Sequence, residues 1–117
     1  MKLSEIMEIL EADNLGAELD DSVVVETACC ADLLSDVLAF TRSTCMLMTG
    51  LIHTQVIRTA EMLDLRLVVI VRGKEPGEDI IKLALEKNIP LMRTNLTMFV
   101  SAGRLYEAGL TGEGLRK

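Results

Sequence analysis

The sequence is poor in aromatic residues, with two phenylalanines, one tyrosine and no tryptophan among 117 residues. Half of the residues are nevertheless apolar. The core is therefore expected to consist of aliphatic side chains and methionine, which fills gaps of irregular shape. No aromatic platform is apparent from the sequence.

Clustered positive charge is also missing. The chain carries 12 lysines and arginines against 18 acidic residues, for a net charge of -6. Proteins that bind nucleic acid neutralise phosphates with grouped cations, so DNA and RNA are not expected as ligands. A partner with a basic patch is easier to accommodate.

Long hydrophobic runs are absent, since the longest covers residues 67–71 and a membrane-spanning helix needs roughly 20 residues. The first residues alternate between acidic and apolar, which is not the pattern of a signal peptide. Of the three cysteines, Cys29 and Cys30 are adjacent and none forms a C-x-x-C pair. We therefore expect a reduced, cytoplasmic protein without membrane contact, with cysteines as small buried hydrophobes and with no metal or cofactor.

Predicted strands and helices alternate along the chain. Strands are expected at residues 23–29, 45–48, 67–71 and 89–92, and helices at 3–12, 33–40, 55–63, 78–87 and 98–108. A short edge strand is also compatible with residues 13–21. Short connections between strand and helix predict an α/β fold, with a mostly parallel sheet of four or more strands flanked by helices in one domain. Residues 111–117 are expected to form a frayed tail.

Several polar residues stand where a helix should begin. Ser4, Asp32, Thr54 and Thr97 are each expected to cap the helix that follows. Pro76 suits the first position of the helix expected at residues 78–87.

In a parallel sheet, all strand-to-helix turns lie at the edge formed by the carboxyl ends of the strands, where ligands of open α/β folds bind. Hydroxyls, one imidazole, two cations and free helix amides at this edge would suit an anionic metabolite or a nucleotide. The candidate ligand-binding residues are Asp32, Thr49, Gly50, His53, Thr54, Arg72, Lys74, Thr94 and Thr97. The alternative is that the capping residues among them only satisfy their own helices.

His53 is the only histidine, and its ring could act as an acid, a base or a ligand, or could be an ordinary hydrogen-bonded loop residue. No Ser/His/Asp arrangement can be argued from the sequence. The segment Arg72-Gly73-Lys74 is not a phosphate-binding P-loop, because Val68 stands at the place of its first glycine and Glu75 at that of its hydroxyl. Nucleotide hydrolysis and kinase activity are therefore not supported.

The order of short motifs resembles a DRTGG domain over about residues 20–110. The matching segments are Asp32-Leu33-Leu34-Ser35, Met48-Thr49-Gly50, Val69-Ile70-Val71-Arg72-Gly73-Lys74, Asn88-Ile89-Pro90-Leu91, Thr97-Met98-Phe99 and Gly103-Arg104-Leu105-Tyr106. The similarity is greatest to stand-alone members related to the N-terminal domain of HPr kinase/phosphorylase. The chain departs from the family pattern at Leu51 and Ile52, where an Asp-Arg pair would follow the Thr-Gly pair.

The resemblance implies an α/β fold like that of the HPr kinase N-terminal domain, a homodimer and no established activity. Such domains also occur in long phosphotransacetylases and between the CBS domains of some pyrophosphatases, where regulation and subunit contact are the implied roles. The resulting hypothesis is a non-catalytic regulatory module that dimerises and binds a small anionic metabolite or nucleotide.

Two alternatives stay open. The first is a pure protein-interaction domain that serves a metabolic or redox enzyme, such as an iron hydrogenase system, because stand-alone relatives are found beside hydrogenase components. The second is an enzyme that uses His53 and Asp32.

Overall fold

The computed structural model describes residues 1–40 and 44–112. Its helices are α1 (Leu3–Leu10), α2 (Leu34–Phe40), α3 (Thr54–Leu63), α4 (Glu78–Glu86) and α5 (Met98–Glu107). Its strands are β1 (Asp13–Asn14), β2 (Thr27–Cys30), β3 (Cys45–Thr49), β4 (Leu67–Ile70), β5 (Leu91–Arg93) and β6 (Thr111–Gly112). Within these ranges, no helix has the length and apolarity to cross a bilayer.

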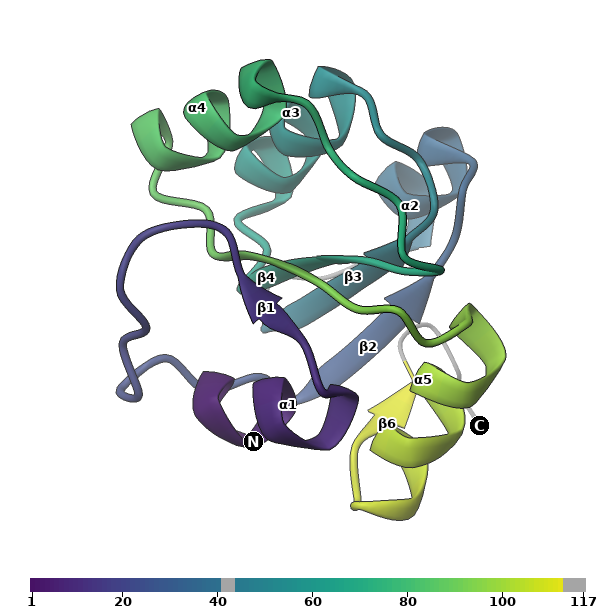
Figure 1. Ribbon diagram of the computed structural model, residues 1–117. Coiled ribbons are helices and arrows are strands. Elements are labelled where there is room, and N and C mark those ends of the chain that lie inside the picture. The colour runs from purple at the N-terminus through teal and green to yellow at the C-terminus, as the bar shows by residue number, and fades with distance from the viewer. Residues whose placement is uncertain (41–43, 113–117) are drawn as a thin grey trace.

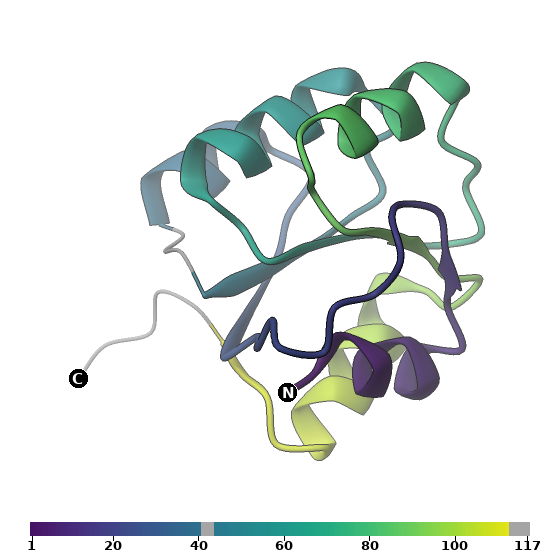
Figure 2. The same ribbon diagram turned by 90° about the vertical axis from the view of Figure 1, so that its left-hand side faces the viewer.

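The strands form one sheet in the order β1-β5-β4-β3-β2-β6. All neighbouring pairs are parallel except β1 and β5, where Asp13 faces Arg93 in an antiparallel pair. Helices α2, α3 and α4 cover one face of the sheet, and α1 and α5 cover the other (Figures 1 and 2). The predicted α/β architecture with a mostly parallel sheet is confirmed.

The central strands β3 and β4 are buried on both faces of the sheet, and successive side chains of each strand point to opposite faces. In β3, Cys45 and Leu47 pack in the core beneath α2, α3 and α4. The intervening Met46 and Met48 pack in a second core against α1 and α5. A strand covered on both sides has no polar face, which explains why β3 and β4 read as continuous apolar runs.

The strand predicted at residues 23–29 is wrong in its first half, since β2 begins only at Thr27. The β-branched run that suggested a strand instead pairs with the start of the chain. The amide of Val25 donates to the carbonyl of Met1 over 2.8 Å, and Val24 forms an isolated antiparallel bridge with Lys2. Sequence propensity alone could not identify this distant partner.

The frayed tail predicted from residue 111 is wrong at its first two residues. Thr111 and Gly112 form β6, which adds to the sheet in parallel beside Thr27 and Ala28. The remainder of the predicted tail, 113–117, lies outside the described residues.

The helix predicted from residue 3 does begin at Leu3, but the capping role predicted for Ser4 is wrong. Lys2 occupies the cap position of α1, and its amide donates to the carboxylate of Glu5 over 2.9 Å. The hydroxyl of Ser4 donates instead to Asp21, also over 2.9 Å. The Ser4 hydroxyl is therefore hydrogen-bonded to a carboxylate that is distant in sequence.

Of the predictions for the starts of α4 and α5, one is wrong and one is confirmed. Pro76 is not the first residue of α4, because Gly77 occupies the cap position and the helix begins at Glu78. The cap predicted at Thr97 is confirmed, since its hydroxyl accepts a hydrogen bond from the amide of Val100 at 3.3 Å.

Candidate functional site

The turns that follow the parallel strands lie at one edge of the sheet, as predicted. Cys30, Thr49, Ile70 and Arg93 end four neighbouring parallel strands. Their carboxyl ends are at the right of Figure 1. The chain continues from them into the segments that hold the candidate residues. These segments therefore lie close together because the strands that precede them are parallel neighbours in the sheet.

Asp32 connects the first two of these turns. Its Oδ1 accepts hydrogen bonds from the hydroxyl of Thr49 at 2.9 Å and from the amide of Gly50 at 2.8 Å. The Thr49 oxygen in turn accepts from the amide of Leu51 at 3.1 Å. The prediction that Asp32 caps α2 is therefore wrong: α2 begins at Leu34, and the carboxylate is bonded to the end of β3.

These contacts favour the charged form of Asp32. The amide of Gly50, and then the hydroxyl of Thr49, are the largest effects and lower the pKa of this carboxyl. Desolvation comes next and raises the pKa, by more than the nearby positive charge of Lys74 or of Arg72 lowers it. The carboxylate is therefore ionised at neutral pH.

Lys74 connects this turn to the one that follows β4. Its ammonium nitrogen donates to the carbonyl of Gly50 over 2.8 Å. A Cβ added at Gly50 would lie 3.5 Å from this nitrogen and 3.7 Å from Oδ1 of Asp32. Gly50 therefore lies between a cation and an anion. We use the name edge cluster for five residues: Asp32, Thr49, Gly50, Arg72 and Lys74.

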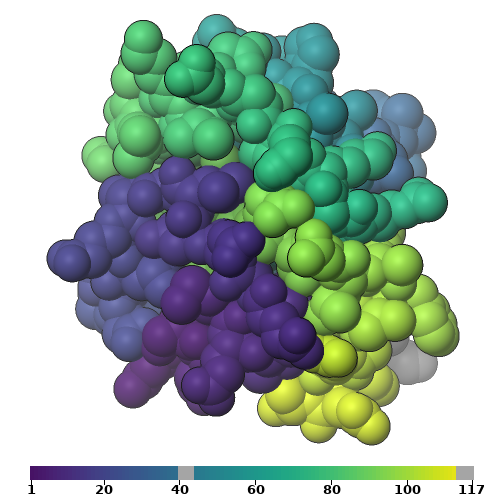
Figure 3. Space-filling view, in the orientation of Figure 1, coloured from purple at the N-terminus to yellow at the C-terminus, as the bar shows by residue number. Residues whose placement is uncertain are grey.

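Arg72 and Gly73 bend the chain back toward β5. Both have left-handed backbone angles, with φ of 67° and 69°. The amide of Arg72 donates to Leu96 over 2.8 Å, and that of Gly73 donates to Thr94 over 2.9 Å. Figure 3 shows this segment on the surface, next to the start of α5. The side chain of Arg72 is left exposed at the edge.

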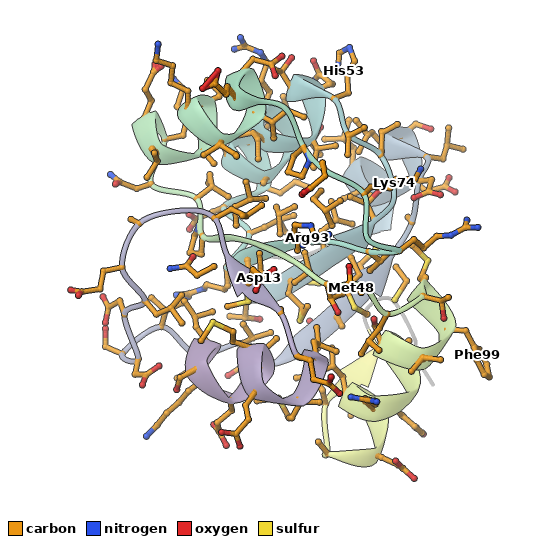
Figure 4. The ribbon with its side chains drawn as sticks, viewed as in Figure 1. Asp13, Met48, His53, Lys74, Arg93 and Phe99 are labelled. Carbon is orange, nitrogen blue, oxygen red and sulfur yellow. The ribbon has the colours of Figure 1, made fainter. Side chains whose placement is uncertain are left out.

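Arg93 holds the Lys74 segment in place, a role that the sequence analysis missed. Its guanidinium donates to the carbonyl of Lys74 at 3.3 Å and to that of Gly73 at 3.1 Å. It also pairs with Glu75 at 3.2 Å and with Asp13 of β1 at 3.0 Å (Figure 4). In the sequence, this role is indicated by an arginine at the end of a short apolar strand.

His53 lies apart from the edge cluster. It is the cap of α3, where its Nδ1 accepts a hydrogen bond from the amide of Gln55 at 3.0 Å. The cap predicted at Thr54 is therefore wrong, because Thr54 is the first helical residue. Figure 4 shows the imidazole at the outer end of the helical layer, away from Lys74.

The two later threonines are also engaged in local structure. The hydroxyl of Thr94 is buried, donates to the carbonyl of Leu10 over 2.6 Å, and accepts from the amide of Leu96 at 3.1 Å. Thr97 caps α5. These side chains hold turns together, so the structure does not direct them toward a ligand shared with Lys74.

An apolar hollow of about 290 Å³ lies on the other face of the sheet, between α5 and the strands β2 and β6. Cys30 and Met48, at the carboxyl ends of β2 and β3, are on one side, and Phe99 and Tyr106 of α5 are on the other. The sequence suggested no aromatic platform, yet two of the three aromatic residues line this hollow.

The three cysteines have different environments. Cys45 is buried and Cys29 is half-buried, but Cys30 is an exposed residue, so the prediction that all three are buried is wrong for Cys30. Desolvation of its thiol, and secondarily the neighbouring Cys29, raise the pKa of Cys30 to about 11. The thiol is therefore neutral at pH 7. Among residues 1–40 and 44–112, no three metal-ligating side chains lie close enough together to hold an ion.

Comparison with known proteins agrees with this architecture. The fold is similar to a crystal structure of the CBS and DRTGG domains of the regulatory region of Clostridium perfringens pyrophosphatase, in complex with the activator diadenosine tetraphosphate. The TM-score is 0.70 at 17% sequence identity, over 89% of this chain and 45% of that one. This chain thus spans less than half of that protein. Comparison with curated proteins gives no match. The DRTGG domain pattern matches residues 5–108, and the chain belongs to the DRTGG domain family.

Proposed function

We propose that this protein is a non-catalytic regulatory module that binds a small anionic metabolite or a nucleotide at the edge cluster. The observation that carries the proposal is the 2.8 Å bond from Lys74 to the carbonyl of Gly50. It fixes an ammonium group at the carboxyl edge of the sheet, where ligands of open α/β folds bind. The exposed guanidinium of Arg72 adds a second cation.

The cluster combines groups that suit a phosphorylated compound with hydroxyls. A guanidinium binds phosphate oxygens through two parallel hydrogen bonds, and an ammonium acts as a point charge. Oδ1 of Asp32 already accepts hydrogen bonds from Thr49 and Gly50. We therefore propose that Oδ2 accepts a hydrogen bond from a sugar hydroxyl of the ligand. His53, Thr94 and Thr97 already bond backbone groups, so we place them and Thr54 outside the ligand contacts.

The pyrophosphatase regulatory region supports the choice of ligand class. That structure contains a dinucleotide activator that carries four phosphates. By analogy of fold, we extend a regulatory role and a nucleotide ligand to this chain.

A thermal-shift titration tests the proposal. A ligand that binds only the folded state raises the melting temperature. We expect a nucleoside triphosphate or pyrophosphate to raise it, and we expect Arg72→Ala to abolish the rise. Arg58→Ala is the matched control, because Arg58 is an exposed arginine of α3 that does not belong to the edge cluster. Equal shifts in both variants, or no shift with any anion, would contradict the proposal.

A second candidate function is protein interaction, including the homodimer implied by the family. The observation in its favour is a set of exposed apolar side chains on the outer helices, among them Met62 of α3 at 68% exposure and Leu85 of the adjacent α4 at 46%. Such a surface would serve a second copy or a metabolic or redox enzyme. Sedimentation at several concentrations tests the dimer, and Met62→Glu should weaken it. A monomer at every concentration would eliminate the homodimer.

A further inference from the structure

The hollow beside α5 has a buried floor and exposed aromatic walls. Met48, Leu105 and Leu110 are at most 5% exposed and form the floor. Phe99 and Tyr106 are 86% and 74% exposed. Exposed aromatic rings beside an apolar surface lack the packing contacts that a bound ligand would supply.

The hollow is neutral as well as apolar. Among residues 1–40 and 44–112, none of those that line it is an aspartate, glutamate, lysine or arginine, although a quarter of the chain is charged. The Cys30 thiol at its rim is protonated at pH 7, because desolvation raises its pKa to about 11. The part of a ligand that enters must therefore be uncharged.

The hollow also has room at its rim. A Cβ added to Gly103 of α5 or to Gly112 of β6 would meet no atom of the described residues, 1–40 and 44–112, within 4 Å. Its volume of about 290 Å³ lies just below the range of roughly 300–1,000 Å³ for pockets that enclose whole ligands. One planar ring system fits this space better than a complete nucleotide.

We propose that this hollow binds an uncharged planar ring of nucleobase size over its apolar floor, with Phe99 and Tyr106 at its rim. The hollow and the edge cluster lie at the same strand ends, since Cys30 precedes Asp32 by two residues and Met48 immediately precedes Thr49. The choice of a nucleoside as occupant rests on the proposed function, because the edge cluster at these same strand ends is the site proposed for its phosphates.

Tyr106 makes the proposal directly measurable. It is the only tyrosine of the chain, so the ring signals of protein labelled with ¹³C-tyrosine come from the hollow alone. We expect adenosine, which carries no phosphate, to shift these signals in a saturable way at millimolar concentration or below. We expect Phe99→Ala to weaken adenosine binding at least about fivefold, which is the lower limit for loss of one stacking partner. Tyrosine signals that do not respond to adenosine would overturn the proposal.

Gly103→Leu blocks the hollow without removing any existing contact. Leucine is a better helix former than glycine, so the variant should stay folded, which the melting temperature will verify. We expect it to abolish the response to adenosine. Ala39→Leu adds a similar side chain to an exposed position of α2 and should leave binding unchanged. Adenosine binding that survives Gly103→Leu would place the ring elsewhere and overturn the proposal.

The same titrations separate this proposal from the proposed function. If pyrophosphate binds through Arg72 and adenosine does not bind, the hollow proposal fails and the edge cluster stands. If adenosine binds and pyrophosphate does not, the hollow stands and the anion site fails. Sedimentation of Gly103→Leu tests another occupant: dissociation of a dimer, with no response to adenosine in the parent protein, would assign the hollow to a second copy and overturn the proposal.

Discussion

The ammonium nitrogen of Lys74 lies 2.8 Å from the carbonyl oxygen of Gly50, and this bond joins the turn after β4 to the turn after β3. On its other side, Gly50 donates its amide to Asp32, which follows β2. Three consecutive strand ends are thereby tied together through one glycine. The candidate site therefore depends on a small set of bonds that single substitutions can remove.

Lys74→Met should weaken both stability and ligand binding. Methionine keeps an unbranched apolar stem but cannot donate to Gly50, so we expect the free energy of unfolding to fall by about 1 kcal/mol and the thermal shift with pyrophosphate to disappear. Lys82→Met is the control, because Lys82 is exposed on α4. Denaturant unfolding measures the first effect. An unchanged pyrophosphate shift in Lys74→Met would count against the edge cluster as the anion site.

The contribution of Asp32 should depend on pH. Its pKa is lowered in the folded protein, so its charge stabilises the fold above the unfolded pKa of about 3.9. This stabilisation is lost as the pH falls through the lower, folded pKa. We expect Asp32→Asn to cost about 1 kcal/mol at pH 7, and we expect the difference to vanish in the acid range.

Unfolding curves of the two proteins from pH 7 downward test this expectation. Asp20, whose pKa is lowered chiefly by the Ser22 hydroxyl and also by its amide, is present in both proteins and cancels in the comparison. Asp64→Asn is a suitable control, since Asp64 is exposed with φ of 56° and asparagine tolerates that conformation. A difference between parent and Asp32→Asn that does not change with pH would exclude a role of the charge.

Arg93 should not be replaceable by lysine. Its guanidinium reaches two carbonyls of the Lys74 segment and the carboxylates of Asp13 and Glu75, which requires a fork of several donors. We expect Arg93→Lys to lower the free energy of unfolding by about 1–2 kcal/mol. It should also weaken anion binding by loosening the segment that carries Lys74.

Amide hydrogen exchange separates these effects of Arg93. The amides of Arg72 and Gly73, which bond to Leu96 and Thr94, should exchange faster in Arg93→Lys, and those of α3 should not. Arg58→Lys serves as the control. Unchanged exchange at Arg72 and Gly73 would show that the backbone bonds alone hold the turn.

Two glycines should respond oppositely to alanine. Gly73 has φ of 69°, and an added Cβ would lie only 3.0 Å from Oδ1 of Asn95, so Gly73→Ala should cost about 1 kcal/mol or more. Gly103 is helical with open space around it, so Gly103→Ala should raise the free energy of unfolding by about 0.4–1 kcal/mol. Thermal unfolding of both variants measures this contrast. A loss of stability in Gly103→Ala would mean that the space beside α5 is already filled.

The sequence by itself determined the α/β class and the common edge. Alternating apolar runs and amphipathic segments, as in Leu67–Ile70 followed by Glu78–Glu86, leave almost no arrangement other than a parallel sheet covered on both faces. That arrangement places Asp32, Gly50 and Arg72 at the same edge. Local chemistry also predicted the Thr97 cap.

Only the tertiary structure decided which polar side chains are committed to which partners. Asp32 and Ser4 were predicted to cap their own helices, but each bonds a group 17 residues away. Arg93 holds Asp13 across 80 residues. Phe99 and Tyr106 line a hollow together with residues of β2 and β3 only because α5 folds back across the sheet. Such contacts depend on chain crossings, and a local pattern of residues carries no information about them.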